Sequence, residues 1–182
     1  MPAAAPMKAG PLRSEPIILF RIGEQLFALS SSSVQEVRSA DSLSGGAYEI
    51  SAQGIDKVRQ FVRRGPNTLF LVSGAAHFGL SAPDGILAFV LRNTRTALLV
   101  DSIEKMTAMT RLQALPLSFC HEERQWYRGL TALDQTVVPV VRPEGFLSDD
   151  ELMMLDGALP PPELPGAETE SEEDTDFDAD LN

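Results

Sequence analysis

The chain has 182 residues, 43% of them hydrophobic, and a formal net charge of −11. This length fits one domain or two small subdomains with a genuine core. The single cysteine, Cys120, excludes an intrachain disulfide framework, and no apolar run approaches the roughly 18 residues of a membrane span or forms the core of a signal peptide. We therefore expect a cytoplasmic protein without direct membrane insertion.

The negative charge is concentrated at one end of the chain. Residues 149–182 contain 13 acidic residues and no Lys or Arg, whereas residues 1–148 contain 13 acids and 15 bases. A nearly neutral domain without a clustered basic face argues against nucleic-acid binding. Residues 158–182 are predicted to form a disordered acidic tail, and the Ala- and Pro-rich residues 1–15 a disordered leader.

The first strong pattern predicts a β-hairpin. Two short apolar runs, residues 17–22 and 25–29, flank Gly23-Glu24. Glycine accepts the positive φ of tight hairpin turns, so the two runs are expected to pair. In the following segment, residues 34–38, the apolar residues fall at i and i+3, which leaves strand and helical turn open.

The next two segments are predicted to be a loop and a helix. Residues 39–54 are polar and rich in Gly and Ser, which is typical of a loop. Residues 55–62 have apolar side chains at positions 55, 58, 61 and 62, which is helical spacing over two turns. The Gly65-Pro66 pair then forces a break.

The later segments are mostly short strands separated by turns. We expect strands at residues 68–72, 86–91, 96–100, 126–130 and 136–141. Residues 102–115 are mixed, with Met and Leu side chains suited to a groove or a core. Trp126-Tyr127 could form a binding platform, although aromatic residues on strands more often lie in the core. The regular spacing indicates a barrel or sandwich.

A short helix is predicted at residues 148–157. Ser148 can act as the N-cap, and three acids follow it at the positive end of the helix dipole. Leu152, Met153 and Leu155 supply an apolar face, and Gly157 can end the helix.

Residue types that carry out catalysis are scarce. Cys120-His121-Glu122 contains a nucleophile, a base and an acid, but sequence neighbours point in different directions and cannot form a triad by themselves. One Cys and two scattered His offer no zinc-site spacing. The acids that alternate in residues 174–180 lack the Gly of a calcium loop, because Ala179 stands at its position. We therefore expect a binding protein without enzymatic activity, cofactor or metal.

Two alternatives remain open. A small enzyme could use Cys120 with the distant His77, in which case Cys120 would be unusually reactive. Alternatively, the acidic tail could bind a basic partner, with the β domain as a scaffold.

The order of motifs over residues 16–156 resembles the CheW-like domain family. The matching motifs, in chain order, are residues 18–29 with Val34-Gln35-Glu36-Val37, Arg64-Gly65 with Phe78-Gly79-Leu80, the strand pair 86–91 and 96–100 ending in Val100-Asp101-Ser102-Ile103, Trp126-Tyr127-Arg128-Gly129-Leu130, and the acidic-then-apolar helix at 148–156. The resemblance implies a mainly β fold of two intertwined five-stranded SH3-like barrels in residues 16–147, with short helices and disordered termini. It also implies an adaptor of bacterial chemotaxis-type, two-component signalling that couples the cytoplasmic tips of methyl-accepting chemoreceptors to the regulatory domain of a CheA-type histidine kinase.

The resemblance also implies protein-binding residues. By position, the receptor-side candidates are Val34, Glu36, Arg64 and Gly65, and weaker candidates from the second hairpin are Val100, Asp101 and Ile103. Each has a structural alternative: the three aliphatic residues as core, Glu36 and Arg64 as an internal salt bridge, and Gly65 as a backbone requirement.

The chain departs from the family pattern near the expected receptor surface. Arg59 stands where the family usually has Gly, and residues 69–74 lack the usual Pro and Asp of the central strand. These departures concern the receptor contact more than the fold.

Overall fold

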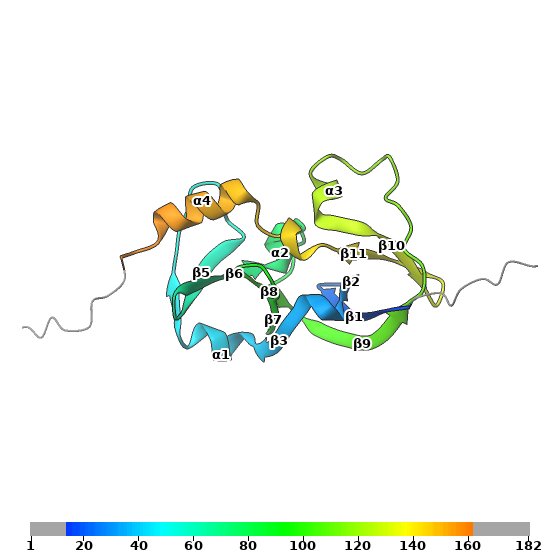
Figure 1. Cartoon of the computed structure of the whole chain (residues 1–182), viewed down its shortest axis with the longest axis horizontal. Helices are drawn as coiled ribbons and strands as arrows, with labels where there is room; N and C mark the ends of the chain where they lie inside the picture. The colour runs from blue at the N-terminus through cyan, green and yellow to red at the C-terminus, as the bar shows by residue number, and fades with distance from the viewer. Residues whose placement is uncertain (1–13, 162–182) are drawn as a thin grey trace, which may run out of the picture.

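The fold consists of two β-sheets, described by a computed structural model for residues 14–161 (Figure 1). The first sheet has the order β10-β11-β2-β1-β9 and the second the order β3-β7-β8-β6-β5-β4. The strands of the first sheet are β1 (Glu15–Ile22), β2 (Gln25–Ser30), β9 (Ser102–Met109), β10 (Tyr127–Leu133) and β11 (Thr136–Val141). Those of the second are β3 (Val34–Ser39), β4 (Ala47–Glu49), β5 (Val58–Arg64), β6 (Asn67–Ser73), β7 (Leu87–Leu91) and β8 (Thr96–Val100).

Short helices connect and cover the strands. They are α1 (Ala40–Ser44), α2 (Gly74–His77), α3 (Glu123–Trp126), α4 (Asp149–Ala158) and the 3-10 turns η1 (Ser31–Ser33) and η2 (Pro143–Gly145). No helix in residues 14–161 is long and apolar enough to span a membrane. The disorder predicted for the leader and for most of the tail concerns residues 1–13 and 162–182, which lie outside the described residues.

The two sheets are intertwined in chain order. The chain builds β1 and β2 of the first sheet, then all six strands of the second, and returns to the first sheet for β9, β10 and β11 (Figure 1). This arrangement confirms the predicted mainly β class with two interleaved sheets. The predicted five strands are found in the first sheet, whereas β4 makes a sixth strand in the second.

Contacts beyond the strand ladders join distant strands within each sheet. Past the end of β9, Gln113 and Leu130 of β10 exchange backbone hydrogen bonds of 2.7 and 2.9 Å, which joins the two outer strands of the first sheet. In the second sheet, Glu36 on β3 and Arg64 on β5 form an ion pair at 2.5 Å. These strands are four spacings apart, roughly 19 Å in a flat sheet, so the sheet must curl to bring them together.

A large core cluster is shared by the two sheets. It contains Phe20 and Phe27 from the first sheet and Phe89 from the second, and the Phe20 and Phe89 rings meet edge to face with centroids 5.3 Å apart. Ile17 and Leu19, on the opposite face of β1, belong to a separate cluster formed within the first sheet. Because both faces of β1 are buried, its sequence is continuously apolar rather than alternating.

The helix predicted at residues 55–62 is wrong, since this segment contains β5. The register between β5 and β6 shifts between Val58 and Gln60, which makes Arg59 the extra residue of a β-bulge. The bulge returns Phe61 to the same face as Val58, and both residues are buried in the shared core. Two apolar residues three positions apart therefore share a strand face, which imitates helical spacing.

The segment predicted as a loop, residues 39–54, contains α1 and β4. The Ser39 side chain caps α1 by accepting a hydrogen bond from the Ser42 backbone N–H, and Leu43 is buried under the second sheet. β4 then pairs with β5 from Ala47 to Glu49. The polar composition of this segment reflects short elements that expose most of their surface.

Helix α4 covers the second sheet beside β5 and β6 (Figure 1). Ser148 and Glu151 form the reciprocal hydrogen bonds of a capping box at its start. Leu155 is fully buried in the shared core, Glu151 pairs with Lys57 at 2.7 Å, and Asp156 receives two hydrogen bonds from Arg95. The Arg95 guanidinium lowers the pKa of the Asp156 carboxyl. The helix is thus packed onto the domain rather than appended to it.

Truncating Leu155 should destabilise the protein more than truncating its neighbour Met153. The Leu155 side chain is 0% exposed, whereas Met153 is 74% exposed. We expect Leu155→Ala to lower the free energy of unfolding by about 2–5 kcal/mol, because it removes buried methyl groups and leaves a cavity. Met153→Ala should change it by less than about 0.5 kcal/mol. Urea unfolding of both variants measures the difference, and equal effects would contradict the packing of α4.

Buried His77 should make stability depend on pH. Its ring packs between Trp126 and Phe146, Nε2 has no hydrogen-bond partner, and burial, with the Lys57 charge, lowers its pKa to about 3. An unfolded His titrates near pH 6.5, so between these values the unfolded chain binds more protons. The free energy of unfolding should therefore fall as the pH drops below about 6.5, by up to about 1.4 kcal/mol per pH unit.

Denaturant titrations between pH 7.5 and 4.5 test this dependence. His77→Phe should remove this component of the profile, while His121→Gln, a change at the other histidine on an exposed position, should keep it. A His77→Phe profile that still follows the parent protein would contradict the assignment.

Candidate functional site

The predicted residues Glu36 and Arg64 meet at the rim of the second sheet. Arg64 Nη1 lies 2.5 Å from Glu36 Oε1, and Arg38 Nε lies 3.8 Å from the other carboxylate oxygen. About a third of each side chain in the Glu36–Arg64 pair is exposed. The internal salt bridge weighed from the sequence is therefore present, and the same two groups also face solvent where a partner can reach them.

Gly65 serves the backbone of the β5–β6 hairpin. Its φ is +58°, and Arg64 pairs with Asn67, so Gly65 and Pro66 form the two-residue turn. A positive φ followed by proline matches a type II′ turn, in which glycine is strongly preferred at the first position. No atom lies within 4 Å of the position that a Cβ would take, so conformation rather than crowding requires the glycine here.

Val34, Val100 and Asp101 are largely committed to internal contacts. Val34 and Val100 belong to the shared core, and Val100 is fully buried. The Asp101 carboxylate accepts a 2.5 Å hydrogen bond from the Gly23 backbone N–H, and its own N–H donates to the Arg21 carbonyl at 2.9 Å. Asp101 thereby fastens the β1–β2 turn to the end of β8.

Ile103 differs from these three because its side chain reaches the surface. On β9, Ile103 pairs with Phe20 and Met106 pairs with Ile18, so both lie on the face of the sheet that carries the shared core. Ile103 is 38% exposed and Met106 is 69% exposed. They form a small exposed apolar patch on that face of β9.

Met106 was not singled out from the sequence. The only signal was the presence of Met and Leu side chains in residues 102–115, which suited a groove or a core equally well. The register of β9 against β1, including the bulge opposite Leu19 and Phe20, decides which of these side chains share the face of Ile103.

Arg64 also lines a pocket of about 410 Å³ at the end of the second sheet. The pocket lies between the β5–β6 and β7–β8 turns and is lined by Gln35, Arg64, Asn67, Thr68, Leu69, Val90, Leu91, Thr94 and Arg95. None of these residues is acidic. Arg95 donates to the Thr68 carbonyl and pairs with Asp156, so its guanidinium is fixed in place at this pocket.

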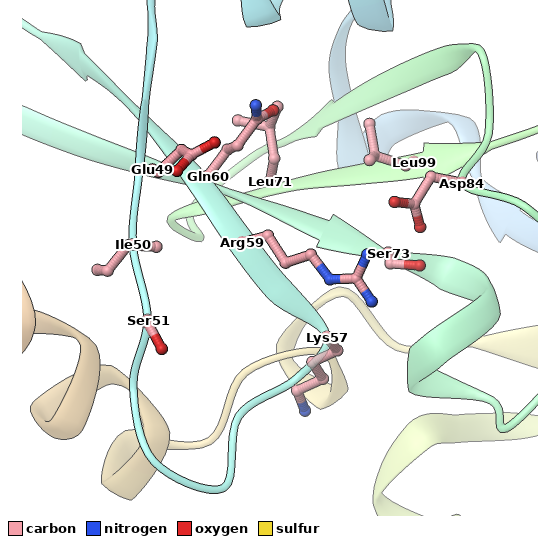
Figure 2. A pocket seen from close by; sticks show the side chains of 10 residues that line it. All are labelled: Glu49, Ile50, Ser51, Lys57, Arg59, Gln60, Leu71, Ser73, Asp84 and Leu99. Carbon is pink, nitrogen blue, oxygen red and sulfur yellow. The ribbon is translucent and has the colours of Figure 1, made fainter.

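A larger pocket, of about 670 Å³, surrounds Arg59 (Figure 2). It is lined by Glu49, Ile50, Ser51, Lys57, Arg59, Gln60, Leu71, Ser73, Asp84 and Leu99. The β-bulge aims the Arg59 side chain into this pocket, toward Ser73 in Figure 2, and the Arg59 carbonyl accepts a hydrogen bond from the Ile50 N–H. The residue that departs from the family pattern thus contributes a cation to a pocket of mixed charge.

The structure does not bring together the residues of the enzyme alternative. Cys120 is exposed, and its Sγ accepts a weak hydrogen bond from the Glu123 N–H. His77 is buried among aromatic rings, with Nδ1 3.4 Å from Lys57 Nζ. Among residues 14–161, no three His, Cys, Asp or Glu side chains are grouped to hold a metal ion. Cys120 and His77 thus lie in different surroundings, one exposed and the other buried.

Comparisons with known proteins agree on one family. The model of the CheW-like domain matches residues 16–151. A probable chemotaxis protein CheW from Rhizobium etli is 27% identical over 143 residues, which cover 74% of this chain and 88% of that protein. The crystal structure of the scaffolding protein TtCheW from Thermoanaerobacter tengcongensis matches with a TM-score of 0.61 at 11% identity, over 82% of this chain and 96% of that one. The chain therefore belongs to the CheW-like domain family.

Proposed function

We propose that this protein is a non-enzymatic adaptor that couples chemoreceptor tips to a CheA-type histidine kinase in a chemotaxis-type array. The observation that carries the proposal is the CheW-like match across both interleaved sheets, residues 16–151, rather than over one of them. The relatives named above are a chemotaxis protein and a scaffolding protein. Cys120 is exposed whereas His77 is buried against Lys57, which favours a binding role over the enzyme alternative.

The proposed receptor-side surface combines a polar pair with an apolar patch. The half-exposed Glu36–Arg64 ion pair lies on the second sheet, and Ile103 with Met106 forms the patch on the first. An apolar centre with a polar rim is the usual anatomy of a protein interface, and an apolar groove flanked by charges suits an amphipathic receptor helix. Val34 and Gly65 would support this surface from the core and from the turn.

Pull-down assays with a CheA regulatory domain and a chemoreceptor tip test the coupling role. The protein should retain each partner separately at low salt, and both together. Failure to retain either partner at low salt would overturn the proposal. Binding of only one would restrict the protein to that half of the array.

Reversing the charge of Arg64 should weaken receptor binding while leaving the fold intact. Arg64→Glu places two carboxylates opposite each other, but the pair is partly solvated, so the stability cost should be about 1 kcal/mol or less. Affinity for the receptor tip should fall roughly tenfold or more, which corresponds to at least about 1.4 kcal/mol. Arg111→Glu, at an exposed position just past the end of β9, is the matched control.

The double variant Glu36→Arg/Arg64→Glu separates a docking role from a structural one. It restores an ion pair with reversed polarity, so stability should recover while receptor binding stays weak. Recovery of both would show that the pair acts only by holding β3 against β5. Circular dichroism melts and fluorescence anisotropy with a labelled receptor tip provide the two readouts.

Polar substitution of the apolar patch should reduce binding without unfolding the domain. Ile103→Ser/Met106→Ser removes apolar surface that is already partly or mostly exposed, so we expect a change in unfolding free energy of about 1 kcal/mol or less. Receptor affinity should fall about tenfold, since central apolar contacts dominate interface energy. Val137→Ser, at another exposed apolar position on the first sheet, is the control. Equal affinities of the three proteins would place the interface elsewhere.

A further inference from the structure

The end of the second sheet carries a cluster of arginines. The arginine cluster consists of Arg38, Arg63, Arg64, Arg92 and Arg95. Arg38 and Arg64 share the Glu36 carboxylate, and Arg95 is paired with Asp156. The other two guanidiniums bind backbone carbonyls, Arg92 that of Val34 and Arg63 that of Pro160.

Charge at this cluster is only partly neutralised. Two carboxylates, Glu36 and Asp156, pair with three of the five guanidiniums, and the other two bind neutral groups. Glu144 and Asp149 line a neighbouring pocket with Arg95, on the side of α4, and therefore act on one edge of the cluster. The 410 Å³ pocket at the centre, between Arg64 and Arg95, has no acidic lining. This surface is suited to carboxylates supplied from outside the described part of the chain.

The chain itself carries such carboxylates, and it leaves the described region at this surface. Residues 162–182 contain nine acidic residues and no basic ones. After α4, the carbonyl of Pro160 accepts a hydrogen bond from Arg63, whose neighbours Arg64 and Thr68 line the pocket. The acidic segment therefore begins next to the arginine cluster, and a short tether gives an effective concentration in the millimolar range.

We propose that the acidic segment, residues 162–182, docks in cis onto the arginine cluster. Guanidinium groups bind carboxylates through paired, charge-assisted hydrogen bonds, and several such contacts in succession require no unique conformation of the segment. Salt should release it, because these charges are partly exposed and are screened over about 10 Å at 0.1 M ionic strength.

The cluster includes Arg64, so docking has a consequence for partner binding that rests on the proposed function. The segment and a receptor tip would compete for the same guanidinium. The acidic segment would then set a threshold that only partners of sufficient affinity overcome, and neutralising it would raise the affinity for the receptor tip.

Paramagnetic relaxation in the full-length protein tests the docking without any partner. The native thiol is replaced by Cys120→Ser, a single cysteine is introduced by Ala179→Cys, and a nitroxide is attached there. At 50 mM NaCl, the amides of residues 35–38, 63–65, 67 and 68 should broaden several-fold more than those of β9, and 500 mM NaCl should abolish the effect. Arg38→Gln should weaken the broadening, whereas Arg111→Gln, an equal charge change at an exposed position past the end of β9, should not.

Three results would overturn the proposal. They are the absence of selective broadening at low salt, equal effects of Arg38→Gln and Arg111→Gln, and broadening of an unlabelled, isotope-enriched chain when it is mixed with spin-labelled chain that carries no isotope. The last result would assign the segment to a second copy.

A parallel variant with Gln or Asn at every acidic position from 168 to 180 should lose the broadening and bind the receptor tip several-fold more tightly at 50 mM NaCl. Selective broadening without any receptor binding would uphold the docking and refute only the adaptor role.

Discussion

The packing of β1 against both sheets is the constraint on which the rest of the structure depends. One face of β1 contributes Phe20 to the core shared with the second sheet, where it meets Phe89 edge to face, and the other face contributes Ile17 and Leu19 to the core of the first sheet. Burying an aromatic side chain of this size stabilises the fold by about 1.5–3 kcal/mol, and the strand cannot slip by one residue without exchanging its two faces. The two sheets are therefore one cooperative unit rather than two independent domains.

The surface features follow from that arrangement. Because β9 pairs with β1, Ile103 and Met106 lie on the face that carries the shared core and form an exposed apolar patch there. Curling of the second sheet brings β3 against β5, and the Glu36–Arg64 pair forms at its open rim. Helix α4 reaches the same end of the sheet, where Asp156 holds the Arg95 guanidinium in place. Arg95 and Arg64 line the same pocket there. The apolar patch, the ion pair and the arginine cluster are thus all consequences of closing two sheets around a common core.

Electrostatics at this end of the domain differ from the net charge of the chain. The protein is acidic as a whole, yet one end of its second sheet carries five arginines, two of which, Arg64 and Arg95, line a pocket without acidic residues. Half of the acids, 13 of 26, lie in residues 149–182, so residues 1–148 are nearly neutral and can display a local positive surface. Local charge, rather than net charge, governs which partner approaches this rim. The reason is that salt limits the electrostatic interaction of exposed charges to a distance of about 10 Å at 0.1 M ionic strength.

Local chemistry in the sequence determined the hairpin turns, most strands and the capped helix α4, because these depend on residues close together in the chain. The capping box at Ser148 and Glu151 and the positive φ of Gly65 are examples. Tertiary structure decided what depends on distant pairing. The bulge at Arg59 explains why residues with an apparently helical spacing form the strand β5. Val100 is buried in the core, whereas Ile103 and Met106 are exposed at the surface. Residues from β3 and β5 become neighbours only when the second sheet curls, and those from β1 and β9 only when strands far apart in the chain pair. A linear pattern holds no information on either event.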